Sequence, residues 1–175
     1  MSKAFTREDD VKGEEVVPRH VSPLPPGARN YLTSGGARRA REELTRLRTV
    51  ERPALQAAPT AGGVAAAESE EQLKRVNLRI ADLQLSLSTA EVTSPPAPPH
   101  DAVHFGATVT VRDERGAEKT YRIVGVDEAD LERNEVSWLS PIARALLNAR
   151  LGQRVPFKFP SGMAQLEIVR IAYKE

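Results

Sequence analysis

Apolar residues recur at steps of three and four over two stretches in the first half of the chain. The first stretch follows Thr33, which stands where a helix N-cap is expected. Its apolar positions are Ala37, Ala40, Leu44 and Leu47. Those of the second stretch are Leu73, Val76, Ile80, Leu83, Leu87 and Ala90. This is the spacing of a heptad seam, and two such stripes joined by a short turn predict a pair of antiparallel helices.

The segment between the two stripes, "AAPTAGGVAAAESEE", predicts the tip of this helical pair near residues 59–67. Pro53 predicts a bend within the first arm, and Pro59 predicts its end. The adjacent Gly62 and Gly63 favour a flexible turn. A second arm of about 24 residues would project on the order of 36 Å.

The hydrophobic period changes to two in the last third of the chain. "ATVTVRD" and "EKTYRIVGV", on either side of Arg115 and Gly116, predict a β-hairpin. "EVSWLS", "QRVPFKF" and "AQLEIVRIAY" predict three further strands. "PIARALLNA" predicts a helix that begins at Pro141 and is capped by Ser140. This part of the chain is therefore predicted to be a small antiparallel α+β unit.

Proline-rich segments divide the chain into four predicted parts. Residues 1–30 are expected to form a flexible tail and residues 31–92 the helical hairpin. Residues 93–101, "TSPPAPPHD", are expected to be a linker, and residues 102–175 the second domain. The predicted fold class is α+β.

Composition and charge exclude several classes of function. Aromatic residues make up only 5% of the chain, which is little for one compact core. Twenty-five Lys and Arg residues oppose 24 Asp and Glu residues, so contact with nucleic acid would require a local patch. The absence of cysteine excludes disulfides and thiolate nucleophiles, and the three histidines lack metal-ligand spacing. No apolar run suits a secretory or membrane segment, so we expect a cytoplasmic protein.

Five segments resemble the bacterial GreA/GreB transcription elongation factors, and together they extend over most of the chain. They are "YLTSGGARRAREEL", "ERP", "FGATVTVRDERGAEKTYRIVGVDEAD", "SPIARALL" and "EIVRIAY". The resemblance implies an N-terminal antiparallel coiled coil and an FKBP-like C-terminal domain. It implies bacterial RNA polymerase as the partner, with the globular domain on the rim of the secondary channel and the coiled coil inside it. The nascent RNA 3′ end would then lie near the tip, and we expect a monomer.

The chemistry of the family depends on a tip motif, "GDxxENAEY", whose carboxylates help to hold a magnesium ion of the polymerase active site. Magnesium prefers such hard oxygen ligands, and a second metal supports phosphodiester cleavage. This chain lacks the motif, and its arms are together about eight residues shorter, or roughly 6 Å less in reach. Glu68, Glu70 and Glu71 could substitute for the motif, or could simply favour the positive end of the helix dipole. We expect no metal site or cofactor belonging to the chain itself.

Two groups of residues are candidates for contact with the polymerase. One matches the family pattern at the start of the predicted C-terminal helix, namely Ser140, Pro141, Ile142, Ala143 and Arg144. The other is a set of first-arm cations that could meet RNA or the channel wall, namely Arg38, Arg39, Arg41, Arg46 and Arg48. These arginines could equally form a solvated helix face with internal ion pairs. Trp138 is expected in the core or at the domain interface.

Three functions follow from these observations. The favoured one is a polymerase-binding regulator that stimulates transcript cleavage weakly or not at all, acting as an accessory factor and not as an enzyme. The second is a cleavage factor that works through Glu68, Glu70 or Glu71. The third is a prolyl isomerase, which would need an aromatic-lined pocket that the scattered aromatic residues do not favour.

Overall fold

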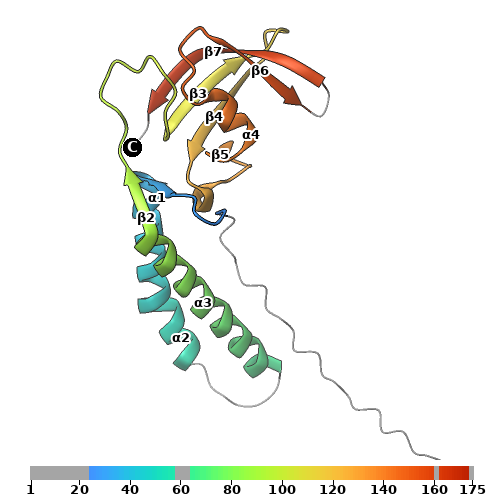
Figure 1. Cartoon of the computed structure of the whole chain (residues 1–175). Coiled ribbons are helices and arrows are strands. Elements are labelled where there is room, and N and C mark those ends of the chain that lie inside the picture. Colours follow the sequence, from blue (N-terminus) through green and yellow to red (C-terminus); the bar gives the residue numbers. More distant parts are fainter. Residues whose placement is uncertain (1–23, 58–63, 160–161, 174–175) are drawn as a thin grey trace, which may run out of the picture.

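The computed structural model describes residues 24–57, 64–159 and 162–173, as two packed helical arms and a curled sheet domain (Figure 1). Most of the predicted tail, together with Pro59 and the Gly62-Gly63 turn of the predicted tip, lies outside these ranges. No helix in the described part of the chain is long and apolar enough to cross a membrane. The predicted division into domains stays a prediction, while the α+β class is confirmed.

The first arm consists of α1 (Ser34–Arg46), the π-helical segment η1 (Leu47–Glu51) and α2 (Arg52–Ala57). Thr33 caps α1 as predicted, because its hydroxyl accepts a hydrogen bond from the Gly36 N–H. Pro53 does not end the helix. Since proline lacks an N–H and its ring crowds the carbonyl four residues earlier, the turn before it is widened, and the Arg52 N–H bonds to the Leu47 carbonyl.

The second arm is α3 (Val64–Thr89), and it packs along the first arm over the predicted seam. Leu47, Ile80 and Leu83 are each about 5% exposed. Ala40, Leu44 and Val76 pack around these three side chains. Arg79 crosses between the arms and donates two hydrogen bonds to Glu43, at 2.8 and 2.9 Å. The seam is therefore confirmed in its middle part.

Two short strands that the sequence pattern did not predict join the bases of the arms. β1 (Asn30–Thr33) pairs in parallel with β2 (Ala90–Thr93), from Asn30 opposite Ala90 to Thr33 opposite Thr93. Ala90 is thus a strand residue, and its assignment to the helical stripe was wrong. Asn30, placed in the flexible tail by sequence, is buried, and its side chain donates to the Ser86 carbonyl at 3.0 Å. Four residues are the lower limit for a period-two signal, and "NYLT" does not alternate apolar with polar residues.

The sheet domain contains five strands in the order β5-β4-β3-β7-β6. Their bounds are β3 (Ala107–Arg112), β4 (Glu118–Val124), β5 (Glu135–Ser137), β6 (Arg154–Phe159) and β7 (Gly162–Tyr173). The predicted hairpin at Arg115 and Gly116 is confirmed, and Gly116 takes a φ of +84° that suits glycine. The prediction of a wholly antiparallel sheet was wrong, because β4 and β5 pair in parallel. The chain returns between them through the short 3-10 helix η2 (Val126–Glu128).

The core of the sheet domain lies between the strands and α4 (Pro141–Leu146). Val109, Ile123 and Ile168 are fully buried on the strands, and Leu146 is fully buried on the helix. The predicted helix is real but ends three residues earlier than the sequence pattern indicated. This packing fixes the loop before α4 on the surface of the domain.

Candidate functional site

The first turn of α4 presents Pro141 and Arg144 to solvent. Ser140 is the N-cap, and its hydroxyl accepts from the Ala143 N–H at 3.2 Å. Ile142 and Ala143 are buried in the core of the domain, so they anchor the helix and cannot be direct contacts of a partner. Of the five residues predicted here, Pro141 and Arg144 are exposed and Ser140 is partly buried.

Trp138 connects this loop to the base of the arms. Its ring meets Tyr31 of β1 edge-on at 5.3 Å between ring centroids, and Tyr31 also contacts Phe105 at 5.6 Å. The prediction that Trp138 is a core or interface residue is confirmed. Aromatic contacts thus couple the Ser-Pro loop to the strand that leads into α1.

A buried carboxylate holds the start of the first arm against the sheet domain. Glu128, in η2, is only 5% exposed at its side chain. Its Oε2 accepts from the Thr33 N–H at 2.8 Å and the Gly125 N–H at 3.0 Å. Its Oε1 accepts from the Thr33 hydroxyl at 2.5 Å and lies 3.5 Å from an Arg39 nitrogen. Several donors on one carboxylate satisfy its charge in this buried position.

Two glycines make room for this contact. A Cβ at Gly36 would overlap the carboxylate of Glu128, and one at Gly125 would overlap the Tyr31 carbonyl oxygen. By contrast, a Cβ at Gly35 would meet its nearest neighbour, an Arg39 nitrogen, at an ordinary 3.5 Å. The close approach of α1 to η2 therefore requires glycine at positions 36 and 125.

The residue before Glu128 holds the second arm. Asp127 Oδ2 accepts a hydrogen bond from the Ser86 hydroxyl at 2.6 Å. Neighbouring acids of η2 thus contact one arm each. Sequence reasoning did not find them, although "GVDEAD" lies inside one of the segments that carried the resemblance.

The three glutamates proposed for the tip lie on exposed positions of α3. Glu70 pairs with Lys74 at 3.4 Å, and Glu71 pairs with Arg75, both within the helix. The first turn of α3 contains no acidic residue, so the proposed dipole explanation for all three glutamates was wrong. Nowhere in the described ranges do three acidic or histidine side chains form a group that could hold a metal.

The first-arm arginines are exposed, and three of them are already paired. Arg38 lies 4.0 Å from Glu42, Arg39 pairs with Glu128, and Arg46 lies 3.4 Å from Glu51. Within the described residues, Arg41 and Arg48 form no ion pair. The free charge of this arm is therefore smaller than the count of arginines indicates.

The interarm pair of Glu43 and Arg79 has an electrostatic consequence. Hydrogen bonding by the Arg79 guanidinium holds the pKa of the Glu43 carboxyl below its ordinary value, against a smaller opposing effect of burial. The charged form of Glu43 is thus stabilised by folding.

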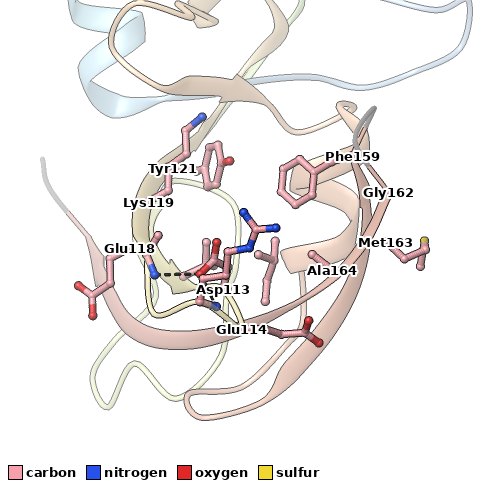
Figure 2. A pocket seen from close by; sticks show the side chains of 13 residues that line it. Asp113, Glu114, Glu118, Lys119, Tyr121, Phe159, Gly162, Met163 and Ala164 are labelled. Atoms are coloured by element: carbon pink, nitrogen blue, oxygen red, sulfur yellow. Dashed lines mark hydrogen bonds between the residues drawn. The ribbon is translucent and has the colours of Figure 1, made fainter.

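A hollow of about 540 Å³ opens between the β3–β4 and β6–β7 hairpins (Figure 2). Tyr121 and Phe159 face it, and they are the two aromatic residues among its described lining. Lys119 lies over the Tyr121 ring, and Glu118 pairs with Arg112. Asp113 accepts from the backbone of its own turn. Lys119, Glu118 and Asp113 thus make contacts within the β3–β4 hairpin.

Known proteins resemble the chain over nearly its whole described length. A family model described as "Transcription elongation factor, GreA/GreB, C-term" matches residues 98–173. The transcription elongation factor GreA of Alkalilimnicola ehrlichii is 44% identical over 152 residues, which cover 81% of this chain and 96% of that protein. The chain belongs to the GreA/GreB family. The resemblance inferred from the sequence is thereby confirmed.

Other members of the GreA/GreB family match a similar span. The transcription elongation factor GreB of Neisseria meningitidis serogroup B is 34% identical over 154 residues, covering 83% of this chain and 94% of that protein. Among solved structures, the elongation factor GreA/GreB from Nitrosomonas europaea is 24% identical with a TM-score of 0.41. That match covers 83% of this chain and all of the other.

Proposed function

We propose that this GreA/GreB-family factor binds bacterial RNA polymerase through the loop at Ser140, Pro141 and Arg144, and inserts its arms into the secondary channel. In this proposal the arms form an antiparallel coiled-coil hairpin, and the sheet domain has an FKBP-like architecture that serves docking and not isomerisation. The factor acts on the polymerase, and a magnesium ion at the tip would belong to the polymerase active site.

The observation that carries this proposal is that buried and exposed residues lie side by side in the first turn of α4. Ile142 and Ala143 are buried and hold the helix, whereas Pro141 and Arg144 remain exposed beside them. A helix turn that is already anchored in the core loses little conformational entropy when it binds, which favours affinity. The exposed Arg144 offers a planar cation that suits a carboxylate of a partner.

We further propose that stimulation of transcript cleavage is weak. Glu70 and Glu71 already have cationic partners on their own helix, which compete with a metal for the carboxylates. Arms that are shorter by about four residues each also lose roughly 6 Å of reach. Glu68 is exposed and three residues from Glu71, so it is the residue through which the cleavage alternative would have to act.

Arg41 and Arg48 are the arm residues that we propose for contact with the channel wall or the nascent RNA 3′ end. They are seven positions apart along the first arm, about two helical turns, and neither is in an ion pair within the described residues. Such cations would add a contact that weakens with rising salt.

The test of docking combines Pro141→Gly with Arg144→Glu and measures binding to core RNA polymerase. We expect affinity to fall at least tenfold, about 1.4 kcal/mol. The control variant Arg170→Glu makes the same charge change at an exposed residue of β7 and should leave affinity unchanged. If the double variant folds, as circular dichroism can establish, and binds within about twofold of the unmodified protein, the loop is not the docking site.

A further inference from the structure

Asp127 and Glu128, the two acidic residues of η2, lie at the junction between the sheet domain and the two arms. Glu128 accepts a hydrogen bond from the N–H of Thr33, the residue before α1. Asp127 accepts one from the hydroxyl of Ser86, near the end of α3. Both arms are therefore contacted at their bases by one three-residue helix of the sheet domain. The side chain of Glu128 is buried, whereas its contact with Arg39 and the hydrogen bond between Ser86 and Asp127 lie at exposed positions.

A small rotation of the arms relative to the sheet domain becomes a large displacement at the far ends of the arms. α3 has 26 residues, so its length is about 39 Å. A rotation of about 5° at the base would move its far end by roughly 3 Å. Misplacement of about 1 Å can change the effect of a functional group by on the order of a hundredfold.

The carboxylate chemistry explains why the angle is fixed. The N–H groups of Thr33 and Gly125 both point at Oε2 of Glu128, and the Thr33 hydroxyl points at Oε1. Only a group with acceptors on both branches satisfies all three donors, and a carboxylate has them. An amide would place an NH2 group against donors on one branch.

We propose that Glu128 is the positioning residue that sets the direction in which the arms leave the sheet domain, with the exposed Asp127 adding a hydrogen bond to the second arm. This inference rests on the proposed function for its effect on transcription, but not for its effect on the angle. Glu128 contributes no contact to the polymerase itself. It determines where the arm ends lie once the Ser140 loop is docked.

The angle can be measured without polymerase, because the chain has no native cysteine. Spin labels on Gln72→Cys of α3 and Gln165→Cys of β7, both exposed, report the distance between arm and sheet domain. In the otherwise unmodified protein we expect one narrow distance distribution. Glu128→Gln should at least double its width, and Glu132→Gln, an exposed glutamate of the same connection, should leave it unchanged.

Thr33→Ser and Thr33→Val extend the test if Glu128→Gln fails to fold. Serine keeps the hydroxyl that bridges Glu128 and Gly36, whereas valine has the same shape without it. We expect the serine variant to keep the narrow distribution and the valine variant to broaden it. Unchanged distributions in both Glu128→Gln and Thr33→Val, or in the valine variant alone if the first does not fold, would overturn the inference.

Assays with polymerase then distinguish a change in the direction of the arms from a general loss of structure and binding. With Glu128→Gln at saturating concentration, we expect affinity for core polymerase within twofold of the unmodified protein and a change of at least fivefold in its effect on elongation rate. Equal loss of affinity and effect would mean a merely structural role and would overturn the inference. Failure of the unmodified protein to bind polymerase would instead count against the proposed function, and the distance measurement would still decide the role of Glu128.

Discussion

Glu128 accepts hydrogen bonds from both donors of Thr33, from its backbone N–H at 2.8 Å and from its hydroxyl at 2.5 Å. The same hydroxyl accepts from the Gly36 N–H and caps α1. One threonine thus starts the helix and ties it to the sheet domain. Because the carboxylate is buried and fully partnered, the junction should be sensitive to small changes in volume or hydrogen bonding.

The neighbouring glycines Gly35 and Gly36 should respond to alanine in opposite directions. Gly36→Ala places a Cβ onto the Glu128 carboxylate, so we expect a loss of stability of about 1 to 3 kcal/mol. Gly35→Ala has room for its Cβ and should gain about 0.5 to 1 kcal/mol from the lower entropy of the unfolded chain. Urea unfolding of both variants measures the difference, and equal effects would show that α1 does not approach η2 this closely.

The seam of the arms should depend on Leu83. It is 5% exposed, so Leu83→Ala should cost about 2 to 5 kcal/mol through lost transfer free energy and a cavity. Leu85, on the same helix but 63% exposed, provides the matched control, and its alanine variant should stay within about 0.5 kcal/mol of the unmodified protein. Helix melting followed by circular dichroism would contradict the seam if the two variants melted together.

The pair of Glu43 and Arg79 should make stability depend on pH. The pKa of Glu43 is lowered in the folded protein, so its contribution is complete at neutral pH and is lost as the pH falls through the ordinary glutamate range to the folded pKa. The pair is partly exposed, and its contribution should stay below about 1 kcal/mol. Unfolding in urea between pH 7 and about pH 3 measures it.

In that measurement Glu43→Gln should flatten part of the pH dependence. Glu42→Gln removes a neighbouring exposed carboxylate whose distance to Arg38 is 4.0 Å, and should change the profile less. Flattening of the pH dependence by Glu42→Gln that equals or exceeds the flattening by Glu43→Gln would mean that the interarm pair does not carry the effect.

Cleavage of backtracked RNA should be poor. In a stalled elongation complex with labelled RNA, we expect cleavage at least about tenfold slower than with a family member that carries the "GDxxENAEY" tip, because this chain lacks that motif and Glu70 and Glu71 are paired with cations of their own helix. Replacing Glu68, Glu70 and Glu71 together by alanine should then have little effect. Efficient cleavage that this triple variant abolishes would establish the three glutamates as functional ligands.

Elements whose signal is local and periodic could be predicted from the amino-acid sequence. The step of three and four predicted both arms and the buried pair Ile80 and Leu83, because a helix brings such positions to one face. Alternation predicted the β3–β4 hairpin, and Thr33 and Ser140 were recognised as caps because a cap depends only on the residues beside it. The family resemblance also came from contiguous segments, which need no tertiary information.

Features that depend on contacts between segments distant in the chain could not be predicted from the sequence and emerged with the folded structure. The parallel pairing of β1 with β2 and of β4 with β5 joins short strands whose own pattern does not specify a partner. In the motif from Ser140 to Arg144, the sequence did not distinguish buried from exposed residues. The structure shows that Ile142 and Ala143 are buried. Glu128 lies 95 residues from Thr33, and a glutamate in a charged segment looks solvated until packing excludes water from it. Its role as a buried acceptor for the arm follows from that long-range contact alone.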